Sequence, residues 1–305
     1  MPRPLTIAAL QTHHDWNEAA TVARVLGLAH QAADQGAKVI LPSELFEAPY
    51  FCKTDNPRYR ELARPAAGHP TIALFQDFAR ARQVVVPVSF YERTTDALYN
   101  SVAVIDADGA VLGIYRKSHI PQFPGYRENA FFAPSPEGPK VWRTRYLTLG
   151  VGICWDQWFP ELARMMALMG AELLVYPTAI GSEIAADIWD SRDHWQTVMR
   201  GNAGANLVPL MAANRTGREQ DDGVTLDFYG SSFICDHLGA MVASASRDCE
   251  EIVLGTVDLD QAQRARDYWG VYQTRRPDIY QPLARIPAGP PPPAATITAG
   301  ALKSA

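Results

Sequence analysis

Residues 146–170, "YLTLGVGICWDQWFPELARMMALMG", join an apolar run to a helical segment through a short turn. The run YLTLGVGIC has the length and composition of a buried strand. The segment PELARMMALMG is typical of a helix, because Pro160 and Glu161 suit its first turn. The chain must therefore turn sharply just after Cys154. In many α/β enzymes such a strand–turn–helix unit exposes a nucleophile at the end of a sheet.

Cys154 fits two roles by position alone. Free cysteine is among the most frequently buried residue types, so a packing role in the core is one of them. The other role is that of a nucleophile, which requires a base and charge-stabilising groups from other parts of the chain. The rest of the sequence must therefore decide between the two.

The alternation of strands and helices continues on both sides of this segment. Strands are expected at 5–12, 37–45, 84–92, 171–179, 208–214 and 251–259, hairpins at 101–121 and 231–245, and helices at 17–36, 70–82, 190–207 and 260–269. Hairpins inserted among alternating helices and strands predict an α/β fold with mixed sheets. We expect one domain over residues 1–285. The Pro/Ala/Gly-rich tail 286–305 should be extended or disordered, or should lie on a neighbouring subunit.

The composition excludes several classes of protein. The chain has 305 residues, 47% of them hydrophobic and 20% charged, and its formal net charge of -5 argues against a nucleic-acid binder. No apolar run approaches the roughly 18 residues of a membrane span, and the N-terminus lacks a secretory signal, so we expect a cytoplasmic protein. The cysteines at 52, 154, 235 and 249 lack the spacing of a zinc site, and no metal is expected.

Two charged residues stand at other strand ends. Glu44 closes the run AKVILPSEL, and a carboxylate directly after a buried strand is a candidate base with a raised pKa. Lys117 in IYRKSHIP ends the hairpin at 101–121. A single residue of either kind is more often a solvated surface group, so neither is informative without the other.

Together the segments LPSELF, YRKSHIP and GVGICWDQWFPE resemble the nitrilase (carbon–nitrogen hydrolase) superfamily, over nearly all of residues 5–284. The resemblance implies an α-β-β-α four-layer sandwich whose subunits pair into homo-oligomers. It also implies a catalytic triad of Glu44, Lys117 and Cys154 that works with neither metal nor cofactor.

The same resemblance assigns Glu128 in GYRENAFF as a second glutamate, which helps to position the substrate and the lysine. Asn129 departs from the family, which often has Lys there. A papain-like pairing of the cysteine with His119, His194 or His237 is an alternative, but the local pattern of papain-like enzymes is absent.

The triad also makes chemical sense by itself. An amide carbon is a poor electrophile, so the attacking group must be a thiolate, formed when a base such as Glu44 takes the proton of Cys154. Lys117 and the backbone N–H of Trp155 can hold the oxyanion that then develops. Protonated Glu44 can return its proton to the leaving amine.

Within the superfamily, the stretches ELFEAPYF, CWDQWFPE and YPTAIGSE are similar to the branch that acts on N-carbamoyl amines. This implies a small-molecule substrate, N-carbamoylputrescine, hydrolysed to putrescine, CO2 and ammonia in polyamine synthesis. A substrate with a distal ammonium should meet an acid and aromatic faces. Glu183 is expected to supply the acid, and Tyr50, Trp155 and Trp158 to wall the pocket.

Other functions stay open at this point. Gln122-Phe123 replaces a small, acidic pair usual in that branch, so another N-carbamoyl amine or an ω-amide is an alternative substrate. A true nitrilase usually has Glu in place of Asp156. A non-catalytic scaffold is the alternative from a different class, and the intact triad residues argue against it.

Overall fold

The computed structural model describes residues 2–182 and 190–285. Its strands are β1 (Pro4–Gln11), β2 (Val39–Leu41), β3 (Val86–Arg93), β4 (Leu98–Ile105), β5 (Val111–Arg116), β6 (Val141–Arg143), β7 (Thr148–Val151), β8 (Leu173–Thr178), β9 (Leu210–Asn214), β10 (Thr216–Asp221), β11 (Val224–Tyr229), β12 (Phe233–Cys235), β13 (Met241–Ser244) and β14 (Glu251–Asp258). The helices are α1 (Glu18–Asp34), α2 (Pro70–Arg82), α3 (Pro160–Leu168), α4 (Arg192–Asn206), α5 (Leu259–Trp269) and α6 (Pro277–Tyr280). Short 3-10 turns are η1 (Phe51–Lys53), η2 (Pro57–Leu62), η3 (Glu128–Ala130), η4 (Cys154–Trp158) and η5 (Gln281–Ala284).

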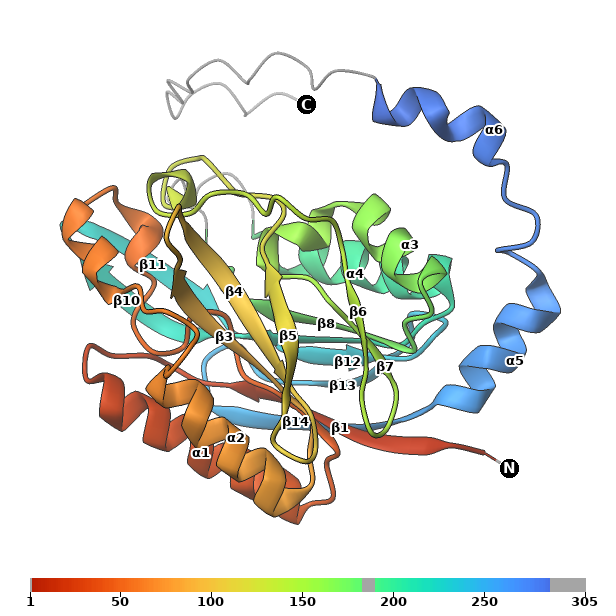
Figure 1. Ribbon diagram of the computed structural model, residues 1–305, viewed down its shortest axis with the longest axis horizontal. Coiled ribbons are helices and arrows are strands. Elements are labelled where there is room, and N and C mark those ends of the chain that lie inside the picture. The colour runs from red at the N-terminus through yellow and green to blue at the C-terminus, as the bar shows by residue number, and fades with distance from the viewer. Residues whose placement is uncertain (1, 183–189, 286–305) are drawn as a thin grey trace.

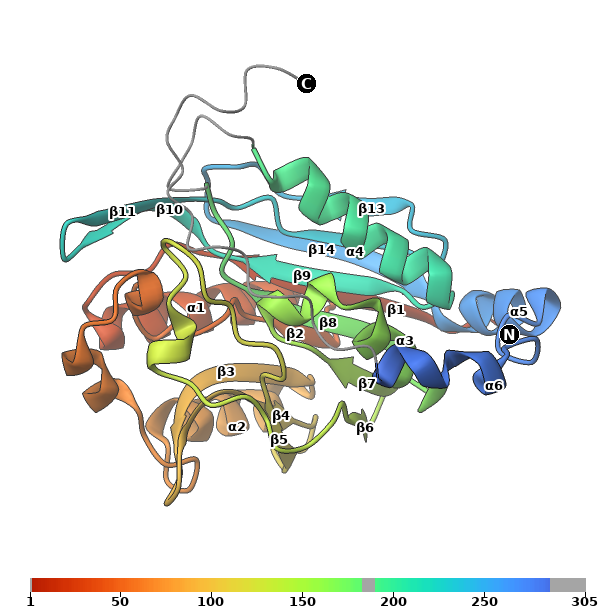
Figure 2. The same cartoon turned by 90° about the horizontal axis from the view of Figure 1, so that it is seen from above.

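Two sheet layers lie face to face between two helical layers (Figure 1, Figure 2). One layer holds β14-β1-β2 and the meander β3-β4-β5, which a single bridge between Val39 and Val85 connects. The other is a six-stranded sheet of order β13-β12-β9-β8-β7-β6, in which β7, β8 and β9 run parallel and the remaining pairs antiparallel. The predicted mixed sheets and α-β-β-α sandwich are therefore confirmed.

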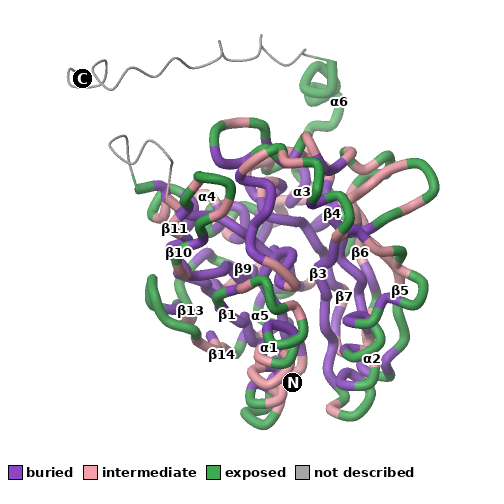
Figure 3. Tube along the Cα trace, turned by 90° about the vertical axis from the view of Figure 1, so that its left-hand side faces the viewer, coloured by how far each residue is buried: buried purple, intermediate pink, exposed green. Residues whose placement is uncertain are grey.

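Strands that are buried on both faces account for the layering. In β1, Ile7 and Ala9 pack between the two sheets, whereas Ala8 and Leu10 pack against the helices α1 and α2. The strand β8 divides its side chains in the same way between the sheet–sheet core and the helices α3 and α4. Figure 3 shows the strands as buried tubes inside partly exposed helices. Continuous apolar runs such as TIAALQ are the sequence signal of such strands.

Two elements differ from the sequence-based expectation. The strand β2 ends at Leu41, so the segment up to Glu44 leaves the sheet and is free to enter the site. The hairpin β10–β11 is not anticipated at all, because the strand TGREQD is too polar to show an apolar pattern. Its turn does carry a signal: Asp222 and Gly223 both have positive φ, the conformation that Asp-Gly favours in two-residue hairpins.

The helices α5 and α6 extend beside the sandwich (Figure 1). Their aromatic side chains face solvent, with Tyr268 88% and Trp269 68% exposed. Among the described residues no helix is long and apolar enough to cross a membrane. The predicted C-terminal tail, 286–305, lies outside the described residues.

Candidate active site

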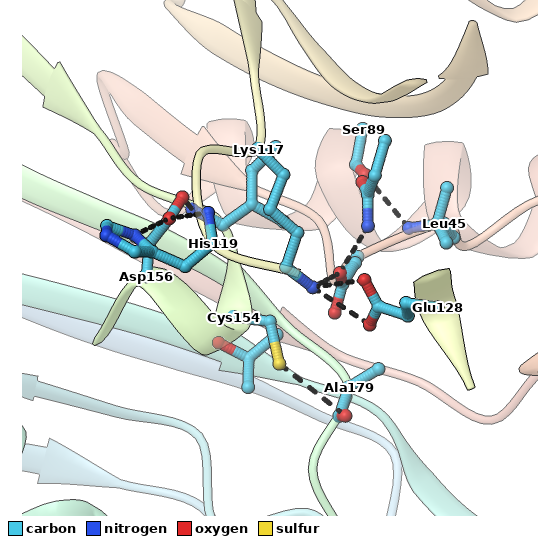
Figure 4. Close-up of polar contacts among 12 residues, drawn as sticks. Leu45, Ser89, Lys117, His119, Glu128, Cys154, Asp156 and Ala179 are labelled. Atoms are coloured by element: carbon cyan, nitrogen blue, oxygen red, sulfur yellow. Dashed lines mark hydrogen bonds and ion pairs between the residues drawn. The ribbon is translucent and has the colours of Figure 1, made fainter. Parts of the chain in front are cut away.

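Four predicted residues come together where three strands end, although they are far apart in sequence (Figure 4). Glu44 follows β2, Lys117 follows β5, and Cys154 follows β7 and begins η4. Glu128 begins η3. All four side chains are buried, with at most 4% of any residue exposed.

Lys117 lies between two carboxylates. Its Nζ is 2.9 Å from Oε1 of Glu44, and 2.9 and 2.7 Å from the two oxygens of Glu128. Burial alone would lower the pKa of Lys117, but the charges of Glu128 and Glu44 outweigh it and hold that pKa well above its usual value. Burial raises the pKa of Glu128 to about 7, against the opposing effect of Lys117. The lysine is thus a fixed cation in a dry site.

Glu44 keeps one oxygen available. Its Oε1 accepts hydrogen bonds from Lys117 and from Nδ2 of Asn100, the latter at 2.6 Å. Its Oε2 is buried and has no hydrogen-bond partner among the described residues. An unpaired, buried carboxylate oxygen is costly unless it serves another group, so Glu44 is suited to accept a proton.

Asn100 is a site residue that the sequence did not single out. It stands opposite Lys117 in the β4–β5 hairpin, where the lysine N–H donates to its carbonyl at 2.9 Å. The hairpin signal at Asp108-Gly109 places the two strands together but does not identify this pair. A register shift between Val104 and Ile105 changes the pairing on the way.

Cys154 occupies a strained backbone position. Its φ is 41°, in the left-handed region that non-glycine residues rarely adopt, at a cost on the order of 1–3 kcal/mol. The strand reaches this turn in close packing, since a Cβ on Gly152 would lie 2.4 Å from the ring of Tyr176. The thiol donates to the carbonyl of Ala179 at 3.6 Å. These features are those of a nucleophile turn, not of a freely packed core cysteine.

The thiol of Cys154 needs a base. Burial and the charge of Glu44 raise its pKa well above the usual value, while Lys117 lowers it and Glu128 raises it further. The resting side chain is therefore a neutral thiol at physiological pH. These electrostatic effects also show that the cysteine is close to the charged cluster.

Asp156 ties the cysteine turn to the lysine. Its Oδ2 accepts the N–H of Ile153 at 2.9 Å and the hydroxyl of Tyr115 at 2.7 Å. Its Oδ1 lies 3.0 Å from the backbone N and 2.7 Å from Nδ1 of His119. One buried carboxylate thus bonds residues on both sides of Lys117 and the residue before Cys154. Its position in the CWDQW motif was noted, but this cross-link is visible only in three dimensions.

The histidines considered as alternative bases have other contacts. His119 bonds Asp156 and stacks on Phe159, with ring centroids 3.6 Å apart. His194, on α4, packs against the ring of Trp158. His237 lies in the turn between β12 and β13. The polar groups that act on the thiol are instead Glu44, Lys117 and Glu128.

The expected pocket residues fall into two groups. Tyr50 is fully buried, and its hydroxyl donates to Oε1 of Glu128 at 2.7 Å, so it supports the site from behind. Trp155 and Trp158 are half-buried, with ring centroids 6.1 Å apart, and Phe123 lies 5.1 Å from Trp155. Glu183 lies outside the described residues.

Metal ligation finds no support in the part of the chain that the structure describes. There, no three His, Cys, Asp or Glu side chains are grouped so as to hold a metal ion. The site chemistry is therefore developed from the buried acid, lysine and thiol alone.

A fold of four layers with this buried cluster defines a class of enzyme. The sequence profile of the carbon–nitrogen hydrolase family matches residues 6–267, so the chain belongs to that family, as the resemblance predicted. It is a carbon–nitrogen hydrolase of the nitrilase superfamily. A crystal structure of a carbon–nitrogen hydrolase from Helicobacter pylori has a TM-score of 0.86 and 36% identity to it, covering 92% of this chain and 98% of that one.

Two individual relatives are similar over almost their full length. An N-carbamoylputrescine amidase from Solanum tuberosum is 50% identical over 296 residues, which cover 95% of this chain and 98% of that protein. A citrullinase from Francisella tularensis is 48% identical over 281 residues, which cover 92% of this chain and 98% of that protein.

Proposed function

We propose that this enzyme hydrolyses the terminal carbamoyl group of a small N-carbamoyl amine, with Cys154 as its nucleophile. The observation that carries the proposal is the buried arrangement of Lys117 between Glu44 and Glu128, next to a cysteine in a strained turn. A buried cation that the protein must hold against desolvation is suited to stabilise a developing anion.

The first step forms a covalent intermediate. As the substrate enters, Oε2 of Glu44 takes the thiol proton, and the sulfur of Cys154 bonds to the carbonyl carbon of the ureido group. The carbonyl oxygen becomes an oxyanion, held by Lys117 and the backbone N–H of Trp155. Glu44 then returns the proton to the leaving nitrogen, the C–N bond breaks, and a carbamoyl thioester remains on Cys154.

The second step releases the enzyme. Water attacks the thioester carbon while Glu44 again takes a proton, and the thiolate leaves and is reprotonated. The released carbamic acid breaks down to CO2 and an amine. The same carboxylate serves both halves of the reaction, which is consistent with its one unpaired oxygen.

N-carbamoylputrescine is the substrate we propose. The N-carbamoylputrescine amidase relative supports it, as do the motifs shared with that branch. The citrullinase at nearly the same identity makes citrulline the second candidate. The two molecules share a ureido group and an ammonium on the fourth carbon, and citrulline has an additional carboxylate on that carbon. The choice therefore depends on how the pocket treats this carboxylate.

A substrate panel distinguishes these candidates. We expect N-carbamoylputrescine to exceed the neutral N-carbamoylbutylamine by about 10- to 150-fold in kcat/KM, because one charge-assisted contact contributes roughly 1.5–3 kcal/mol. L-citrulline should be slower, and N-carbamoyl-β-alanine should be a poor substrate. The measurement is ammonia release at matched concentrations.

Each other outcome of the panel has a definite meaning. Highest kcat/KM on citrulline would replace the proposed substrate with the second candidate. Equal rates on the cationic and neutral compounds would remove the role proposed for Glu183, and Glu183→Gln should otherwise abolish the preference. Faster turnover of simple amides or nitriles would contradict the N-carbamoyl assignment while leaving the cysteine chemistry unaffected.

Glu128→Gln tests the charge balance at Lys117. The substitution is isosteric, so Tyr50 keeps an acceptor, but the largest influence raising the pKa of Lys117 is lost. We expect kcat to fall about 10- to 100-fold. The lysine should also lose its proton at lower pH, so the alkaline limb of the kcat/KM profile should move to lower pH. The surface variant Glu137→Gln is the matched control, and an unmoved limb would contradict this role.

We also propose that the enzyme is a homo-oligomer. The support is the exposure of large apolar side chains on α5 and α6, among them Tyr268, Trp269 and Ile279. Light scattering coupled to size-exclusion chromatography measures the mass directly, and a monomer of 33.6 kDa would contradict the proposal.

A further inference from the structure

We propose that the buried pair Arg215–Glu219 is a positioning device that holds both active-site carboxylates against Lys117. This inference rests on the proposed function, because it assigns the pair a task in the same site. Arg215 lies between β9 and β10, and Glu219 lies within β10, so neither belongs to the motifs that identify the family chemistry in the sequence.

The pair is buried more deeply than stability alone would favour. The side chains of Arg215 and Glu219 are 0% and 4% exposed, and Nη1 lies 2.8 Å from Oε1. Replacing a buried ion pair with apolar residues is often neutral or stabilising, because desolvation offsets the attraction. A buried pair that persists is therefore best explained by the geometry that it imposes on its neighbours.

Arg215 fixes the backbone that carries Glu44. Its Nη2 donates to the carbonyl of Glu44 at 2.7 Å and to that of Leu45 at 3.3 Å, while Nη1 reaches the carbonyl of Ala48 at 3.4 Å. Leu45 has a φ of 46°, so the chain reverses here through a strained residue. The planar guanidinium fork holds several carbonyls of this turn at once, which a single ammonium cannot do.

Glu219 fixes the other carboxylate through Tyr50. One of its oxygens accepts the backbone N–H of Tyr50, and the hydroxyl of that tyrosine donates to Glu128. Because Glu128 and Glu44 both contact Lys117, the contacts form a closed ring. A displacement at the Arg215–Glu219 pair is thereby transmitted to both partners of the lysine.

The test compares Arg215→Lys with Arg218→Lys. Arg218 lies on the same strand and pairs with Asp227 at the surface, so it is a matched control. Both variants are assayed as purified full-length enzyme, using the substrate that the wild type hydrolyses fastest. The readouts are thermal melting, kcat, KM and the pH dependence of kcat/KM.

For Arg215→Lys we expect kcat to fall by about tenfold or more with KM changed less than about twofold, because transition-state contacts are lost and substrate contacts are not. The alkaline limb should move to lower pH, since Glu44 and Glu128 no longer hold their positions beside Lys117 and Cys154. Arg218→Lys should match the wild type in every readout.

A purely structural role gives a different result. Arg215→Lys would then melt at a lower temperature, with kcat per folded molecule and the alkaline limb unchanged, and the inference would be overturned. Should Arg215→Lys fail to fold, Glu219→Gln decides the question, because it keeps an oxygen for Arg215 but loses the acceptor for Tyr50. A shifted limb in that variant supports the device, and an unshifted one refutes it.

Failure of the inference is distinguishable from failure of the proposed function. A normal Arg215→Lys beside an inactive Cys154→Ala removes the positioning role alone. An active Cys154→Ala removes the cysteine mechanism instead, whatever the arginine variant does.

Discussion

Cys154→Ala is expected to abolish turnover, with kcat reduced by at least about 10⁴-fold, because no other group can form the thioester. The fold should persist, since alanine fits the space of the thiol and only the bond to the Ala179 carbonyl is lost. The measurement is ammonia release at high enzyme concentration, together with a thermal melt. Cys249→Ala, at an exposed cysteine, is the matched control and should retain full activity.

The same residue can be tested by chemistry. Iodoacetamide at neutral pH should modify Cys154 stoichiometrically and inactivate the enzyme in proportion, ahead of the buried thiols at 52 and 235. An inert Cys154, or a Cys154→Ala variant that keeps more than about 1% of activity, would contradict the nucleophile assignment. The former result would favour a scaffold protein.

Glu44→Gln is the second large effect. The amide keeps an oxygen for Lys117 and Asn100 but cannot take a proton, and both halves of the reaction pass a proton through this residue. General acid–base catalysis contributes about 10²–10⁴-fold to a single step, so kcat should fall by at least about 10³-fold with KM little changed. Steady-state kinetics and intact-protein mass measurement would show whether any carbamoyl enzyme accumulates.

The matched control for Glu44→Gln is Glu47→Gln. Glu47 lies in the same turn and is largely buried, but it bonds Thr71 instead of the lysine. Burial raises the pKa of Glu47 to about 7, so a neutral amide is a mild substitution there. A near-normal kcat in Glu44→Gln, together with an inactive His119→Ala, would replace the Cys–Glu assignment with a Cys–His one.

Much of the fold follows from local patterns. The turn after Cys154, the start of α3 at Pro160 and the helix over 70–82 agree with the sequence, because apolar periodicity and proline placement act over a few residues. The polar hairpin β10–β11 was missed, since a strand whose pattern is mostly polar lacks an apolar signal. That hairpin contains Glu219, so the error concealed part of the site's support.

What the sequence by itself determined is the chemistry that is available. The motifs around Glu44, Lys117 and Cys154 identify the family and the types of reacting groups. Segment patterns also predict mixed sheets, because burial on two faces requires runs of apolar residues.

Only the tertiary structure decided how these groups meet. Glu44 and Lys117 are 73 positions apart, and their contact depends on the order of the strands in two sheets and on a register shift in β4–β5. Asn100, Asp156 and Arg215 enter the site for the same reason. Hydrogen bonds are short-ranged and directional, so partners on different strands are specified by backbone geometry, which local sequence does not encode.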